Sequence, residues 1–161
     1  VPEAVLEGGV CVKVICGLVG GLQGPVRDIV TDPEYLDITV PAEREFLHPT
    51  RRGHTVLAYV IKGNGFFCPD RQPFSHEIEE NSYFDMKGSA SVGNGMLVLF
   101  SDGDEVSVAT EEDPIRFLLV SGRPIGEPVA WYGPIVMNTQ EELRVAFAEY
   151  QNGTFIKQRE K

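Results

Sequence analysis

The chain has 161 residues, of which 42% are hydrophobic and 24% charged, and this length and composition allow one globular domain with its own core. The formal net charge at pH 7 is −10. Such an acidic surface repels the phosphate backbone of nucleic acids, so we expect no direct binding of DNA or RNA. No stretch approaches the roughly 20 apolar residues of a membrane-spanning helix, so we expect no membrane association.

Glycine, proline and cysteine narrow the class of protein further. The 17 glycines and 11 prolines favour many short strands joined by turns. Cys11, Cys16 and Cys68 form no CxxC pair and are odd in number, so we expect no disulfide framework and a reducing, cytoplasmic location, or a nuclear one in a eukaryote. The chain begins with Val1 instead of Met, which indicates a processed start or a piece of a longer protein.

Strand patterns dominate the chain from its start to about residue 120. Residues 1–8 are expected to be a tether or an edge strand. Alternation predicts strands at 10–15 and 35–40, with Val10, Val12 and Val14 on one face of the first. The nearly continuous apolar run at 55–61 predicts a strand buried on both faces, and the glycines of 62–65 predict a tight turn after it. Further strands are predicted at 66–68, 83–86, 95–100, 105–108 and 115–120.

One helix is predicted near the end, over residues 138–152. Thr139 and Glu142 have the spacing of a capping box, and Gly153 is a typical C-terminal stop. An apolar stripe follows the cap at helical spacing and consists of Leu143, Ala146, Phe147 and Tyr150. Such a stripe covers the face of a barrel or docks on a partner domain.

Three segments resemble the pirin family. They are HPTRRGHTVLAYVIKGNG at 48–65, LVLFSDGDEVSV at 97–108 and GPIVMNTQEEL at 133–143. The resemblance covers about residues 8–157 and matches only the C-terminal half of the family. It implies an all-β cupin fold, that is, a double-stranded β-helix or jelly-roll barrel with one C-terminal α-helix, and a single domain over residues 1–161.

Pirins are similar to one another in having two stacked cupin barrels. The resemblance implies that iron is held in the N-terminal barrel by three His and one Glu, where some bacterial relatives oxidise quercetin with dioxygen. Animal relatives act as nuclear cofactors of transcription regulators. For this chain we expect no cofactor of its own, because the iron-bearing half is not part of the sequence.

The metal motifs of the cupin fold are eroded in this chain. When the first motif is anchored on Gly63, its two His and one Glu positions hold Pro49, Arg51 and Thr55. A one-residue insertion instead makes His48 the first His, places Thr50 at the second, and brings His54 close to the Glu position. His48 and His54 are therefore the weak metal candidates, and two ligands fall short of the three or more that such sites need.

In the second motif, anchored on Gly103, none of the other characteristic residues is present. Their positions are occupied by Ala109, Glu111, Pro114 and Leu118, and proline at the histidine position has no side-chain donor for a metal. We therefore expect neither a catalytic residue nor a metal site in this chain.

Three functions remain open. The leading hypothesis is a non-catalytic cupin domain that packs on an N-terminal cupin or offers a protein-binding face, with Trp131, Tyr132, Phe147 and Tyr150 as interface candidates. The second is a metal-dependent quercetin 2,3-dioxygenase, with activity residing in, or shared with, an N-terminal cupin. The third is a metal-free small-molecule binding module whose barrel is lined by residues such as Phe46, Tyr59 and Phe117. For the isolated chain we expect a homodimer, because a bare apolar surface rarely stays exposed on a monomer.

Overall fold

The computed structural model describes residues 1–68 and 91–157. They form two compact units, Val1–Pro124 and Ile125–Lys161, which are described separately below. The single-domain expectation for residues 1–161 stays a prediction, and the strand expected at 83–86 lies outside the described residues.

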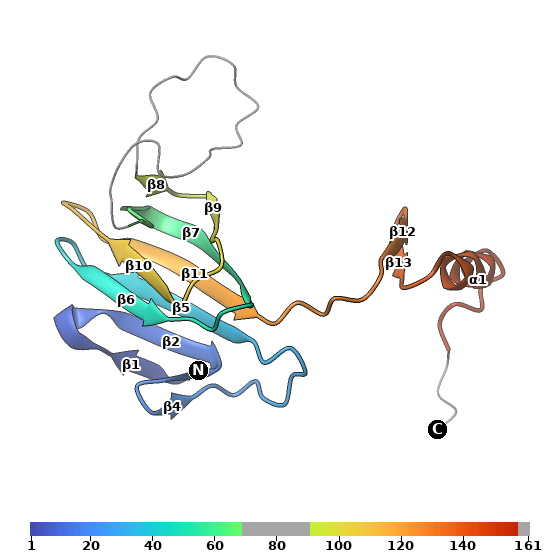
Figure 1. Ribbon diagram of the computed structural model, residues 1–161, viewed down its shortest axis with the longest axis horizontal. Coiled ribbons are helices and arrows are strands. Elements are labelled where there is room, and N and C mark those ends of the chain that lie inside the picture. Colours follow the sequence, from blue (N-terminus) through green and yellow to red (C-terminus); the bar gives the residue numbers. More distant parts are fainter. Residues whose placement is uncertain (69–90, 158–161) are drawn as a thin grey trace, which may run out of the picture. The chain divides into compact units, whose positions relative to one another are not determined.

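The N-terminal unit contains two layers of strands (Figure 1). The larger sheet has the order β1-β2-β5-β11-β7-β8, and β9 also pairs with β7. β6 and β10 form a second, two-stranded sheet, and β3 and β4 a small hairpin. The bounds are β1 Glu3–Val5, β2 Cys11–Cys16, β3 Leu18–Val19, β4 Leu22–Gln23, β5 Glu34–Val40, β6 Glu45–Pro49, β7 Thr55–Gly65, β8 Val92–Gly93, β9 Leu97–Leu99, β10 Glu105–Ala109 and β11 Ile115–Gly122; a short 3₁₀ turn covers Glu7–Gly9.

One hydrophobic core joins these two sheets. The face predicted at Val10, Val12 and Val14 is confirmed as the inward one, since these residues are at most 1% exposed. Leu36, Ile38 and Val40 of β5 are fully buried in the same core. β6 and β10 contribute to the same core, together with β7 and β11. Phe117 is fully buried, and its ring meets that of Phe67 edge-on at 5.3 Å. The alternating pattern therefore identifies the buried face correctly.

The expectation that β7 is buried on both faces is wrong. Val56, Ala58 and Val60 point into the core and are at most 5% exposed. On the other face Leu57 is half-buried and Tyr59 is 43% exposed. Tyr59 therefore does not line the barrel interior as predicted. Its place in the alternation turns it outward, whereas the predicted lining residues Phe46 and Phe117 do point inward.

The tight turn predicted at 62–65 is also wrong, because β7 continues to Gly65. Gly63 has a φ of 82°, and a Cβ added there would lie 2.0 Å from the carbonyl oxygen of Pro114. Only glycine allows this backbone contact. Gly63 lies two residues after a β-bulge, where the register against β11 shifts between Arg116 and Phe117. In place of the strand predicted at 66–68, Phe66 forms an isolated bridge to Ala109.

The structure decides the form of the N-terminal residues and adds one strand, β6, that the sequence pattern did not predict. Residues 3–5 form an edge strand, which pairs with β2 along one side. β6 was not predicted, because its five residues EFLHP are short and end in proline. β6 pairs antiparallel with β10, from Glu45 opposite Ala109 to Pro49 opposite Glu105.

The C-terminal unit consists of a hairpin and the predicted helix. β12 covers Ala130–Tyr132, β13 covers Ile135–Met137 and α1 covers Gln140–Gln151. The capping box is confirmed: the Glu142 amide donates to Thr139 Oγ1 at 3.2 Å, and the Thr139 amide donates to Glu142 Oε2 at 2.9 Å. A small core fixes the helix on the hairpin and contains Ala130, Ile135, Leu143 and Ala146. In the described part of the chain, no helix is both long and apolar enough to cross a membrane.

Candidate functional site

A buried histidine links the two sheets of the N-terminal unit. His48 lies on β6, and the alternation of that strand turns Phe46 and His48 into the core. Glu34 is the first residue of β5 in the larger sheet. The Nε2 atom of His48 lies 2.6 Å from Oε2 of Glu34, and the two side chains are 8% and 21% exposed. The ring of Phe46 stacks on the imidazole at a centroid distance of 5.8 Å. The pair is a hydrogen-bonded clamp between the layers.

The second metal candidate, His54, lies in the turn between β6 and β7. It is half-buried, and its backbone N–H donates to the carbonyl of Arg51 at 3.1 Å. Within residues 1–68 and 91–157, no three His, Cys, Asp or Glu side chains gather closely enough to hold a metal ion.

The residues present therefore do not fit the iron of a cupin enzyme. Such a centre needs three or four protein ligands with open positions. The described interior instead offers one histidine, whose Nε2 already faces Glu34. The rest of the buried set is mainly aliphatic and aromatic.

Aspartates neutralise the basic turn that contains Arg51 and Arg52. Both arginines are exposed; Arg51 pairs with Asp32, and Arg52 pairs with Asp104 at 2.8 Å. The hydrogen bond from Arg52 holds the pKa of Asp104 below its usual range. Because each cation has its own carboxylate, this turn forms no basic patch for a phosphate backbone.

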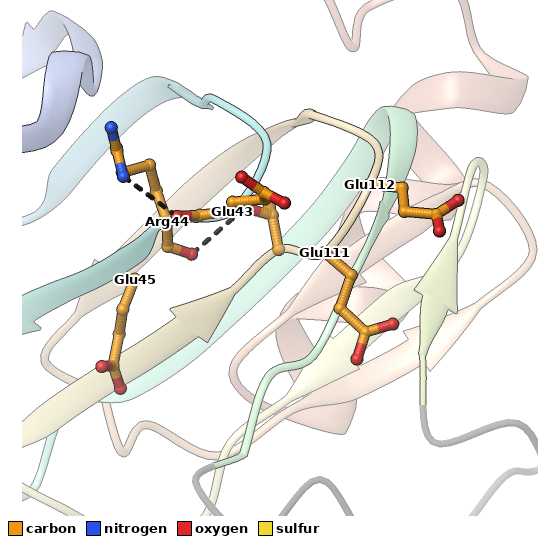
Figure 2. Close-up of a pocket in the computed structure, with 6 residues that line it drawn as sticks. Glu43, Arg44, Glu45, Glu111 and Glu112 are labelled. Atoms are coloured by element: carbon orange, nitrogen blue, oxygen red, sulfur yellow. Dashed lines mark hydrogen bonds between the residues drawn. The ribbon is translucent and has the colours of Figure 1, made fainter.

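An acidic recess lies at the turns that follow β5 and β10. It has a volume of about 530 Å³ and is lined by Glu43, Arg44, Glu45, Thr110, Glu111 and Glu112. The side chains of Glu45, Glu111 and Glu112 point in different directions (Figure 2). The buried hydroxyl of Thr110 already has hydrogen-bond partners within the protein. It donates to the Pro41 carbonyl at 2.6 Å and accepts from the Arg44 amide at 3.0 Å. Diverging carboxylates do not make a cation site.

An aromatic recess lies in the C-terminal unit. It has a volume of about 450 Å³ and is lined by Trp131, Tyr132, Gln140, Leu143, Arg144 and Phe147. Trp131 and Tyr132 are 72% and 70% exposed. The rings of Tyr132 and Phe147 lie 5.3 Å apart, and the indole N–H of Trp131 donates to the Gly133 carbonyl at 2.7 Å. In this arrangement large aromatic surfaces are exposed to solvent, while the indole N–H keeps a hydrogen-bond acceptor.

Three of the four predicted interface residues meet in this recess, and the fourth does not. Tyr150 is 62% exposed and contacts Phe155 at a ring distance of 6.3 Å. Tyr150 does not line the recess.

A family profile described as the Pirin C-terminal cupin domain matches residues 35–156. The chain belongs to the pirin family. It is 35% identical over 156 residues to a pirin-like protein of Caulobacter vibrioides, covering 96% of this chain and 49% of that protein. It is also 35% identical over 148 residues to Pirin-1 of Arabidopsis thaliana, covering 91% of this chain and 46% of that one. The chain thus spans about half the length of these curated pirin relatives.

Solved structures support the cupin fold. A crystal structure of quercetin 2,3-dioxygenase from Acinetobacter baumannii superposes with a TM-score of 0.72 at 24% identity, and the match covers 96% of this chain and 47% of that one. At this identity the likeness concerns the fold. The mostly β architecture with a C-terminal helix, as implied by the pirin resemblance, is confirmed, and α1 is the one α-helix of residues 1–68 and 91–157.

Sequence reasoning missed one member of the buried pair. Glu34 precedes Leu36 and Ile38 with the same parity, so the alternation that predicts their burial also turns Glu34 inward. The recess residues Gln140 and Arg144 were missed, because their contact with the aromatic residues depends on how the β12–β13 hairpin meets the helix. Leu143 had been placed only in the apolar stripe of the helix.

Proposed function

We propose that this pirin domain is a structural and protein-binding half of a two-cupin protein, and that the metal chemistry belongs to the other half. The main support for this proposal is the small number of side chains in the described interior that could bind a metal. Where a cupin enzyme needs several ligands, the described interior has one histidine, and Glu34 occupies its Nε2 at 2.6 Å.

The aromatic recess supports a binding role. Tyrosine and tryptophan are enriched at protein interfaces and supply much of their binding energy. Trp131 and Tyr132 are held in place by a hairpin and a helix, yet most of their surface is exposed. A rigid aromatic pair costs little conformational entropy on binding.

The partner proposed for this recess is the N-terminal cupin. The pirin relatives are about twice as long as the match, and the resemblance implies iron in their other half. A cytoplasmic setting fits this proposal, since in the described structure no disulfide joins the cysteines.

Metal analysis tests the non-catalytic part of the proposal. The purified chain and a His48→Gln/His54→Gln variant are incubated with ferrous iron, desalted and measured for metal content and for quercetin oxidation. We expect equal, substoichiometric iron in both and no turnover. Stoichiometric iron that disappears in the variant, or quercetin oxidation by the wild type, would support the dioxygenase hypothesis instead.

Binding in trans tests the protein-interaction part. The remaining half of the Caulobacter pirin-like protein is titrated with this chain by calorimetry. Replacing Trp131 by Ala is expected to weaken binding at least tenfold, since buried aromatic anchors contribute more than about 2 kcal/mol. Tyr150→Ala is the matched control, because Tyr150 is similarly exposed but lies outside the recess. Equal effects of the two substitutions would contradict the assignment of the recess.

A further inference from the structure

The outer face of the large sheet carries a continuous apolar surface. In one row across the strands, Val120 of β11 lies between Tyr35 of β5 and Leu57 of β7, and Leu57 lies opposite Leu99 of β9. In the next row Leu118 lies opposite Tyr59, and Tyr59 opposite Leu97. Directly paired residues point to the same side of a sheet. We call the seven residues of these two rows the outer patch: Tyr35, Leu57, Tyr59, Leu97, Leu99, Leu118 and Val120.

Within the described residues of the N-terminal unit, part of the outer patch is left exposed. Leu97, Leu99 and Tyr59 are 62%, 70% and 43% exposed. This is the face of β7 for which the sequence pattern predicts burial. Exposed apolar surface of this kind, on a rigid sheet, marks a docking site more often than a free surface.

The outer face also carries no excess of negative charge. Its charged side chains within the paired strands β1, β2, β5, β11, β7 and β9 are three basic and two acidic residues: Glu3, Lys13, Asp37, Lys62 and Arg116. Arg116 holds Asp37 through two hydrogen bonds of 2.9 and 2.7 Å. The acidic excess behind the net charge of −10 therefore lies elsewhere on the chain. Two copies of so acidic a protein repel each other, and an apolar face without excess negative charge lets them meet with the least repulsion.

We propose that the outer patch is the contact surface of a homodimer of this chain. Two copies present identical twisted sheets, which pack face to face at about 10 Å with strands inclined by about 30°. Four strands spaced about 4.8 Å apart and two rows of side chains give an apolar centre of roughly 20 by 13 Å. This centre is smaller than the roughly 800 Å² per partner of a standard stable interface, so the dimer is reversible, with a dissociation constant in the micromolar range.

This proposal goes beyond the protein-binding role of the aromatic recess and uses a different surface. Replacing Trp131 removes the recess and leaves the homodimer intact, whereas substitutions in the outer patch remove the homodimer. The two proposals can therefore fail separately.

Sedimentation of the wild-type chain between about 5 and 500 μM, at low and high salt, is the first test. We expect a monomer–dimer equilibrium that tightens several-fold as salt rises, because salt screens the repulsion between two acidic copies. An interface held by ion pairs would weaken instead. A chain that stays monomeric over the whole range, or a dimer that weakens with salt, overturns the proposal.

Matched leucine substitutions provide the second test. Leu97→Gln/Leu99→Gln changes two exposed residues of the outer patch, and Leu18→Gln/Leu47→Gln changes two residues of similar exposure, 60% and 53%, on other strands. Circular dichroism first shows that both variants are folded. The patch variant is expected to lose dimerisation at least tenfold and the control to keep it. Equal behaviour overturns the proposal. A third outcome also overturns the proposal. In it, the wild type is monomeric, and the patch variant, but not the control variant, fails to bind the remaining half of the Caulobacter relative.

Discussion

His48 and Glu34 join the two sheets of the N-terminal unit through a contact of 2.6 Å between Nε2 and Oε2. Each residue belongs to a different layer, and the contact is mostly shielded from solvent. Removing one partner leaves the other polar group buried without its hydrogen bond, and this loss costs more than the bond itself contributes.

Glu34→Ala is therefore expected to lower the free energy of unfolding by about 1–3 kcal/mol, measured by urea denaturation. His54→Gln is the control, since His54 is half-buried in a turn, and we expect a change within about 0.5 kcal/mol. In a double-mutant cycle, Glu34→Ala and His48→Ala are expected to be coupled by more than about 0.5 kcal/mol. Additive effects would show that the contact does not stabilise the fold.

The Asp37–Arg116 pair predicts how stability changes in acid. The two hydrogen bonds from Arg116 hold the pKa of Asp37 below its usual range. A carboxyl whose pKa is lower in the folded state contributes stability above its unfolded pKa of about 3.9, and this contribution disappears as the pH falls through the folded pKa.

We therefore expect Arg116→Gln to be less stable than the wild type by a constant amount between pH 5 and 7. Because Arg116 is 45% exposed, this amount is expected to be below about 1 kcal/mol. The difference should shrink below about pH 4, as followed by urea denaturation at each pH. A difference that grows in acid would contradict the assignment.

Alanine substitutions at Gly63 and Gly95 can distinguish the cost of backbone strain from the cost of a steric clash. Both have a positive φ, 82° and 81°. A Cβ at Gly63 would meet the Pro114 carbonyl oxygen at 2.0 Å, whereas nothing lies within 4 Å at Gly95.

Gly95→Ala is expected to cost about 1–2 kcal/mol from the left-handed conformation alone, and Gly63→Ala clearly more, because β7 must move away from Pro114. The yield of soluble protein and its melting temperature measure the difference. Equal melting temperatures for the two variants would show that β7 moves away from Pro114 at little cost.

The capping box of α1 predicts a local effect in the C-terminal unit. Thr139→Ala removes the acceptor of the Glu142 amide and is expected to destabilise the unit by about 1 kcal/mol. Trp131 is the single tryptophan of the chain and lies in this unit, so its fluorescence reports the unfolding. Thr139→Ser keeps the hydroxyl and serves as the control; a loss of similar size there would point away from the cap.

Local patterns predicted much of this fold from residues close together in the chain. Alternation at 10–15 and 35–40 identified the inward faces of β2 and β5, because strand geometry repeats every two residues. The Thr139–Glu142 spacing predicted the start of α1, since both hydrogen bonds of a capping box lie within one turn. The sequence also predicts that the metal positions have lost their ligands, because proline and alanine side chains bind no metal; the absence of a metal site stays a prediction.

The tertiary structure alone decided the features that depend on distant residues. Glu34 became the partner of His48 because β5 and β6 lie in different sheets whose side chains meet in one core. The need for glycine at position 63 depends on the Pro114 carbonyl, about fifty residues away in the chain. Tyr59 was expected inside and lies outside, because an apolar run has no period that marks which face is covered.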